Sequence, residues 1–401
     1  MSEHPARHAA IPAVRRRDIL TGALAAALLT PAVAHARPLD TDTRAPAPRK
    51  GGGGLVTRGA GAWVYANRGA SATAIAALAA PSYIGWISGY TRLEVLAPDR
   101  RGRYDWSALD AVQEAAHRVE KPWKDMTIHG SLEVGRPRWQ RDHIPDRDWI
   151  TVTKRGGSTF PVPWSAAART LRVEFEEACA DRYGSDPLHV QHRVVADWPL
   201  AEPWFGGSDP HLWLPAWRGH AGDNATWRDL QLDYQDRELD AIVTSARLWP
   251  QQCTISMATG YGFRDVTTTK PATWSRPEAH PDRYATWSSV RDRLGDRFQA
   301  RQNGAGSPRD DGNYDGAQGF GAWNGRCFGP NGIHPGPIGC QMVKNIGGDD
   351  RMDLARFEKT IAVECGRCRD AEIYSDDLAN PHSRVGAAVA DILTRYADRW
   401  Q

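Results

Sequence analysis

The chain has little of what marks several protein classes. Its 401 residues contain only 6 cysteines, and no long run of one charge sign occurs in the body of the chain. Because 50 Lys and Arg nearly balance 48 Asp and Glu, giving a formal net charge of +2, we expect no nucleic-acid partner. No nucleophile elbow, zinc-protease helix or phosphate-binding loop is present. The composition, 41% hydrophobic and 24% charged, fits a globular protein of one or at most two domains and excludes a membrane bundle.

Tryptophan, by contrast, is abundant. The chain has 17 Trp against 8 Phe and 11 Tyr, and many of these indoles stand beside Gly, Pro or charged residues. Indoles with an exposed polar edge suit flat amphipathic ligands such as sugar rings. The alternative is that they fill a large core.

The N-terminal region has the pattern of an export signal. Residues 14–36 run from a basic segment through a short apolar stretch to Ala-His-Ala, a small-x-small cleavage site. The pair at 16–17 resembles a twin-arginine signal, with an ordinary secretory signal as the alternative. We therefore predict a signal peptide over 1–36, a flexible linker over 37–60 and a single domain over 61–401. The mature protein is expected to be secreted or periplasmic, without stable membrane insertion.

Export favours disulfides, and two cysteine pairs are candidates. Cys327 and Cys340 bracket a loop rich in Gly and Pro, which a bridge would stiffen, and Cys365 and Cys368 form a C-x-x-C motif. A zinc site made by these four cysteines is the alternative, although their spacing matches no standard zinc finger. We assign no metal and no cofactor.

Short apolar runs alternate with amphipathic stretches from residue 61 onward. Strands are predicted over 61–67, 84–95, 124–134, 187–198, 253–262, 298–304, 337–343 and 370–377, and helices over 71–80, 105–119, 165–183, 227–249, 281–295 and 353–365, with a last helix reaching Tyr396. Eight such units predict an α/β fold, a (β/α)₈ TIM barrel with enlarged βα loops. A doubly wound open sheet is disfavoured because no Gly-rich phosphate turn follows the first strand.

Glu202 lies in "WPLAEPWFGG" (198–207), directly after the predicted fourth strand. In a TIM barrel, residues just past the carboxyl end of each strand line one shared mouth. Glu202 is therefore expected to face that mouth.

Three stretches resemble retaining β-galactosidase-like glycoside hydrolases of the Asn-Glu-Pro type. They are "GYTRLEVLAPDRRGRYDWSALDAVQEAAHRVEKP" (89–122), "FPVPWSAAARTLRVEFEEACADRYGSDPLHV" (160–190) and "AEPWFGG" (201–207). The resemblance implies that Glu202 is the general acid/base. The chain departs from the family at Ala201, where the family has Asn, and at Gln341 on the seventh strand, where the family keeps a nucleophilic Glu.

Hydrolysis of a glycoside normally needs a second carboxyl group. Our first candidate is Glu372 on the eighth strand, which shares a face with Tyr374. An inward Glu is costly to bury unless it is hydrogen-bonded or functional. The alternative role for Glu372 is a salt bridge to an arginine such as Arg92 or Arg301.

A long Gly-rich loop after the sixth strand offers a further acidic pair, Asp310 and Asp311, together with Trp323. Loops of this length over a barrel mouth usually bind or cover a ligand. Calcium is the competing interpretation of "DDGNYDG", which lacks the spacing of the standard calcium loop. The other predicted substrate contacts are Trp63, Trp86, Glu94, His129, Trp198, Trp204, Gln341 and Tyr374, with His129 expected to point into the barrel.

The predicted function is a secreted glycoside hydrolase that cleaves an oligo- or polysaccharide by carboxyl acid/base chemistry. Ala201 and Gln341 motivate the alternative, a carbohydrate-binding barrel that has lost catalysis. A structural cell-wall protein is a third hypothesis. In the first two cases the partner is a carbohydrate.

Overall fold

The fold is defined by a computed structural model. It describes residues 55–66, 69–133, 135–152, 158–162, 165–194, 222, 224, 239–258, 290–305, 338–342, 346, 353–366, 368–379 and 382–400.

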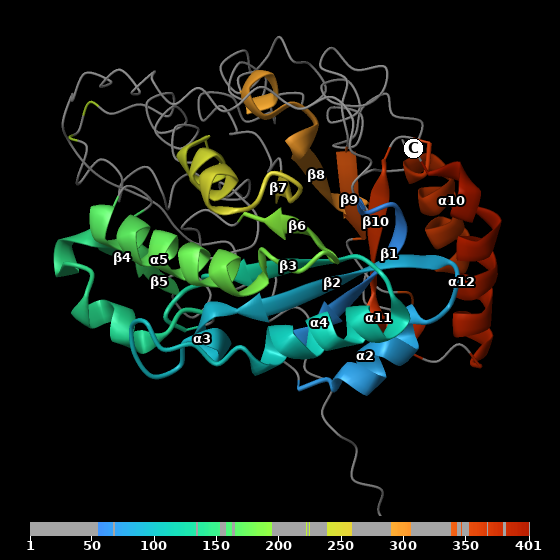
Figure 1. The fold of residues 1–401 in the computed structure, drawn as a ribbon, viewed down its shortest axis with the longest axis horizontal. Helices are drawn as coiled ribbons and strands as arrows, with labels where there is room; N and C mark the ends of the chain where they lie inside the picture. The colour runs from blue at the N-terminus through green and yellow to red at the C-terminus, as the bar shows by residue number, and fades with distance from the viewer. Residues whose placement is uncertain are drawn as a thin grey trace, which may run out of the picture.

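Eight parallel strands close into a barrel in the order β1-β10-β9-β8-β7-β6-β3-β2 (Figure 1). Their bounds are β1 Gly59–Tyr65, β2 Ile84–Arg92, β3 Trp123–Ile128, β6 His189–Arg193, β7 Thr254–Ala258, β8 Phe298–Ala305, β9 Ile338–Met342 and β10 Asp370–Tyr374. The predicted (β/α)₈ barrel is confirmed, and each strand overlaps its predicted range.

Helices surround the strands on the outside (Figure 1). They are α2 Ala72–Ala79, α4 Ser107–Val119, α5 Ala166–Tyr183, α10 Leu354–Glu364 and α12 Arg384–Arg395, and residues 239–248 are also helical. Ser71, Ser165, Asp353 and Ser383 cap α2, α5, α10 and α12 through their side-chain oxygens. No helix in the described parts of the chain is both long and apolar enough to cross a membrane.

The structure differs locally from the prediction at the ends of two strands and in the loop that follows β3. β2 stops at Arg92 and is followed by the short helix α3 Leu93–Leu96, and β10 stops at Tyr374 and is followed by α11 Ser375–Leu378. The long loop expected after the third strand contains an antiparallel hairpin of β4 Trp149–Val152 and β5 Ser158–Pro161. Such short additions carry too few residues for a clear hydrophobic period.

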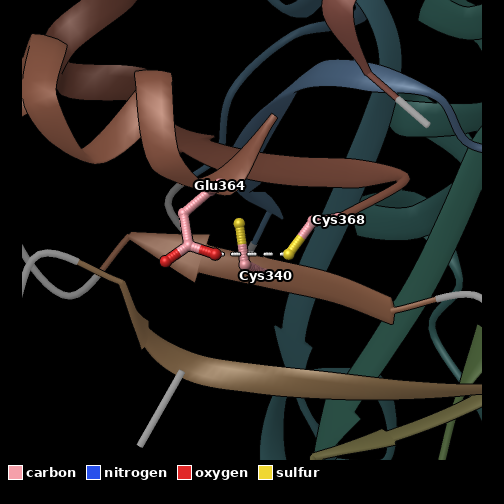
Figure 2. Close-up of side chains that lie close together, drawn as sticks. All are labelled: Cys340, Glu364 and Cys368. Atoms are coloured by element: carbon pink, nitrogen blue, oxygen red, sulfur yellow. Dashed lines mark hydrogen bonds between the residues drawn. The ribbon is translucent and has the colours of Figure 1, made fainter. Parts of the chain in front are cut away.

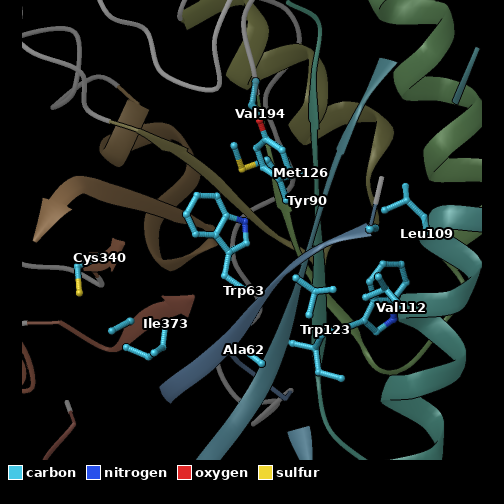
Figure 3. Packing of buried hydrophobic residues seen from close by; sticks show 14 of the residues in the cluster. Ala62, Trp63, Tyr90, Leu109, Val112, Trp123, Met126, Val194, Cys340 and Ile373 are labelled. Carbon is cyan, nitrogen blue, oxygen red and sulfur yellow. The ribbon is translucent and has the colours of Figure 1, made fainter. Parts of the chain in front are cut away.

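The main hydrophobic core lies between the barrel wall and the helices. Val112 and Leu109 of α4 are fully buried, as are Trp123 of β3 and Ile373 of β10 (Figure 3). These side chains follow the helical and strand periods of the sequence, so binary patterning suffices to place them.

Inside the barrel, two glycines make room for large side chains. A Cβ on Gly61 would lie 2.1 Å from the Trp86 ring, and one on Gly339 would lie 2.2 Å from Nη1 of Arg301. Only glycine therefore lets this indole and this guanidinium cross the interior. Thr57, which the sequence placed in the linker, is also buried here and donates to Asp370 at 2.7 Å.

Candidate functional site

The middle of the barrel interior is ionic. Glu372 is wholly buried and contacts cations from three other strands: Lys124 of β3 at 2.5 Å, Arg193 of β6 at 3.2 Å and Arg301 of β8 at 3.4 Å. Ser88 of β2 donates to the same carboxylate at 2.8 Å. The salt bridge between Glu372 and Arg301, which we predicted as the alternative role of Glu372, is therefore present.

These contacts set the charge of the carboxylate. Burial by itself raises the pKa of Glu372, but Lys124, Arg301 and Arg193 outweigh burial and hold it below its usual value. Burial and the charge of Arg301 lower the pKa of Lys124 to about 7, against the opposing effect of Glu372. Glu372 is thus ionised at neutral pH and surrounded by donors.

Two further interior residues are engaged in the same network. Gln341 of β9, 7% exposed, accepts a hydrogen bond from Nη1 of Arg193 at 2.9 Å. Asp370, at the start of β10, lies 2.7 Å from Nη1 of Arg301. An amide on β9 cannot replace a nucleophilic carboxylate, but it can position the guanidinium of Arg193.

Aromatic rings form a layer toward the carboxyl ends of the strands. Trp63 lies 4.6 Å from Tyr374 and 5.5 Å from Tyr90 between ring centroids, and Tyr65 lies 5.2 Å from Tyr90. Tyr374 follows Glu372 by two residues, so it lies one layer closer to the mouth than the carboxylate. We name Trp63, Tyr65, Tyr90 and Tyr374 the aromatic layer.

The aromatic layer has a polar atom with no partner. Nε1 of Trp63 is buried and has no hydrogen-bond partner among the described residues. Beyond the layer, Arg92, the last residue of β2, and Glu94 of α3 form an ion pair at 3.3 Å, with side chains 23% and 34% exposed. Among the four rings only Tyr65 is partly exposed, while Trp63, Tyr90 and Tyr374 are buried. The aromatic layer therefore lies beneath a rim that carries the ion pair of Arg92 and Glu94.

Two predicted site residues lie elsewhere. His129 does not point into the barrel: its ring packs against Phe175 of α5 at 5.6 Å, and burial with Arg136 and Arg172 lowers its pKa well below the usual value. Side chains alternate along β3, and Lys124 faces the barrel interior. His129, an odd number of residues later, therefore faces outward. Trp86 is wholly buried and donates to the Gly59 carbonyl at 3.1 Å, so this indole is a core residue and not an exposed platform.

Other predicted site residues lie outside the described parts of the chain. They are Glu202, Trp198, Trp204, Asp310, Asp311 and Trp323.

A second buried polar cluster, which we did not predict, lies between the barrel wall and the outer helices. Asp125 of β3 contacts Nε2 of His189 at 2.8 Å and Nδ1 of His192 at 2.9 Å. Both imidazoles stack on Trp249, at 4.7 and 4.5 Å. The available signal was the density of polar residues in otherwise buried strands, as in "WKDMTI" and "HVQHR"; we assign this cluster a packing role.

The cysteines correct another expectation. Cys340 is a free, buried thiol, so the expected Cys327–Cys340 bridge is not formed; Cys327 itself lies outside the described residues. Cys365 and Cys368 are free as well. Cys340 alternates with the inward residues Gly339 and Gln341, which directs its thiol outward, toward α10.

Comparisons with known proteins support the architecture. No protein-family model matches the chain, and no curated protein matches it either. Among solved structures, it is similar to the catalytic domain of a β-amylase from Paenibacillus polymyxa, with a TM-score of 0.52, 8% identity, and coverage of 86% of this chain and 100% of that one.

A cold-adapted β-galactosidase from Rahnella sp. R3 gives a TM-score of 0.51 at 11% identity, over 85% of this chain and 56% of that one. A GH42 β-galactosidase gives 0.51 at 12%, over 84% and 56%. The chain thus spans little more than half the length of these galactosidases. At such identities the likeness shows the fold alone: this chain is a (β/α)₈ TIM barrel, similar in fold to these three enzymes.

Proposed function

We propose that the protein is an exported glycoside hydrolase acting on an oligo- or polysaccharide, with Glu202 as the proton donor. The observation that carries the proposal is the place of β6. This strand is the fourth of a closed parallel barrel, and Glu202 follows it in the chain, where a TIM barrel keeps its catalytic side chains. The similar solved structures are a β-amylase and two β-galactosidases, enzymes that act on carbohydrates.

The aromatic layer supports a carbohydrate as the ligand. Sugar rings present apolar faces that stack on aromatic side chains, and their hydroxyls accept bonds from donors such as an indole N–H. Trp63, at the mouth end of β1, has both a ring and an Nε1 for which the described residues provide no partner.

The proposal gives Glu372 a structural role. Its oxygens are bound by Lys124, Arg193, Arg301 and Ser88, and it lies one layer below Tyr374. A carboxylate so engaged has no free lone pair aimed at a sugar. We propose the pair Asp310 and Asp311, in the loop after β8, as the source of the second reacting carboxyl group.

One observation favours the second candidate function, a carbohydrate-binding barrel without catalysis. Gln341 stands on β9, where the resembled family keeps its nucleophile, and its amide oxygen is held by Arg193. A site with a bound sugar and one carboxyl group would recognise a glycan without cleaving it.

Activity against chromogenic glycosides and polysaccharides, measured for the wild type and Glu202→Gln, separates the two functions. If Glu202 is the proton donor, the substitution lowers kcat by roughly 10²–10⁴-fold while sugar affinity remains. Glu177→Gln, an exposed change on α5, is the matched control and should retain full activity. Sugar binding by a wild type without turnover on any substrate would support the binding barrel. Failure to bind any glycan would contradict both.

A further inference from the structure

A cluster of metal-ligating side chains lies outside the barrel, far along the chain from Glu202. Cys340 of β9, Glu364 at the end of α10 and Cys368 just before β10 place one ligand atom each within 4.8 Å of one another. All three side chains are buried (Figure 2). The thiol of Cys368 donates to Oε2 of Glu364 at 3.3 Å.

Backbone structure fixes this arrangement. The amide of Cys368 donates to the Glu364 carbonyl at 2.7 Å, which closes the turn after α10 and sets the two side chains side by side. The pairing of Ala371 of β10 with Cys340 of β9 brings the third ligand to the same place. The cluster therefore comes preformed from one strand, one helix end and the turn that leads into β10, the kind of rigid support that a metal site requires.

We propose that Cys340, Glu364 and Cys368 bind a zinc ion that fastens α10 to β9 and β10. Thiolate sulfur and carboxylate oxygen are both zinc ligands, with bonds of about 2.3 Å and about 2.0–2.2 Å. Two donors on one ion can be no farther apart than the sum of their bond lengths, about 4.6 Å for two sulfurs. The three ligand atoms lie within 4.8 Å of one another, and Sγ of Cys368 is 3.3 Å from Oε2 of Glu364, so small side-chain rotations bring all three within bonding distance of one ion.

The ligand set differs from the one that the C-x-x-C motif suggests. Cys368 belongs to it, but Cys365 does not: its thiol donates to the Ala362 carbonyl at 3.4 Å. On binding, the zinc ion displaces the protons of the two thiols to solvent, and Glu364 supplies the third donor. Because the ion sits beneath α10 and away from the barrel interior, its role is to hold the fold and not to act on a substrate.

The test measures zinc by elemental analysis in the full chain, purified from zinc-supplemented medium without a metal-binding tag, and then replaces zinc with Co²⁺. We expect close to one zinc per chain and a thiolate-to-cobalt charge-transfer band in the near ultraviolet. Cys340→Ser and Cys368→Ser should lower the zinc content at least tenfold. Cys365→Ser is the matched control and should keep both zinc and the band.

Glu364→Gln covers the case in which the cysteine variants fail to fold. It keeps both thiolates, so the cobalt band should remain while the affinity for zinc falls at least tenfold. Wild-type protein without zinc and without the cobalt band would overturn the proposal. So would a Cys340–Cys368 disulfide, seen as the loss of two hydrogen masses from the unreduced chain, or an equal loss of zinc in Cys365→Ser and Cys368→Ser.

Discussion

Nζ of Lys124 lies 2.5 Å from Oε1 of Glu372, and both side chains are wholly buried inside the barrel. The ammonium comes from β3 and the carboxylate from β10, strands that are not neighbours in the sheet. The pair therefore links two strands across the barrel interior through charge. Loss of Glu372 is costly, because it leaves the buried ammonium of Lys124 without the carboxylate that it contacts.

Glu372→Gln should destabilise the fold severely. The substitution keeps the shape of the side chain but leaves Lys124, Arg193 and Arg301 without their common anion, and we expect the free energy of unfolding to fall by about 3–5 kcal/mol. Urea denaturation measures the change. Glu358→Gln, which removes an exposed partner of Arg395, is the control and should cost no more than about 1 kcal/mol. Equal effects of the two substitutions would contradict a structural role for Glu372.

Gly61→Ala should strain the barrel. Its Cβ would lie 2.1 Å from the Trp86 ring, so the indole or the strand must move, and such overpacking typically costs about 1–3 kcal/mol. Gly366→Ala meets only Val363 O at 3.6 Å and serves as the control. Thermal unfolding of the two variants compares them; a Gly61→Ala protein as stable as the control would show that Trp86 does not occupy the space beside Gly61.

Stability should depend on pH through Asp125 and His192. Burial raises the pKa of Asp125, but His192 and His189 outweigh it and lower the pKa below the usual value. The contribution of Asp125 to the free energy of unfolding is therefore present above the unfolded pKa of about 3.9, and it is lost as the pH falls through the folded pKa. Burial lowers the pKa of His192, but Asp125 raises it above the usual value, so that contribution is present below about pH 6.5 and lost as the pH rises through the folded pKa.

The contribution of the pair is thus largest between about pH 4 and 6.5. Urea unfolding from pH 3 to 8 should show that the stability difference between wild type and Asp125→Asn peaks in this window. Asp391→Asn, an exposed change on α12, is the control and should follow the wild-type profile. A difference that stays constant with pH would refute the assignment.

Trp63→Phe should separate ligand binding from folding. The substitution keeps a ring in the aromatic layer and removes an N–H that has no partner among the described residues. Because the smaller ring leaves a cavity, the free energy of unfolding should fall by about 1–2 kcal/mol, which the fold can tolerate. Affinity for a bound oligosaccharide should fall by about three- to tenfold, the loss of one neutral hydrogen bond. Calorimetric titration with the glycan found in the activity screen measures it. Unchanged affinity would place the sugar away from Trp63.

The local pattern of the sequence was enough to predict the barrel. Strands and amphipathic helices each have a characteristic spacing of apolar residues that can be recognised in consecutive residues. The predicted ranges therefore match α5 closely and include β6. The position of Glu202 after the fourth strand follows from the same count. The hairpin β4–β5 was missed because its four-residue strands are too short to carry a period.

The partners of the buried side chains were decided only by tertiary structure. Alternation predicted that Glu372 faces inward, and Arg301 was one of the partners that we expected. Lys124 of β3 and Arg193 of β6 were not predicted, because only barrel closure brings these strands to the same carboxylate. The same alternation, started one residue out of phase, placed His129 inside instead of against Phe175. The face of a sheet on which a strand residue lies follows from the alternation of its neighbours in the sequence. The charged groups that this residue contacts depend on strands far apart in the chain.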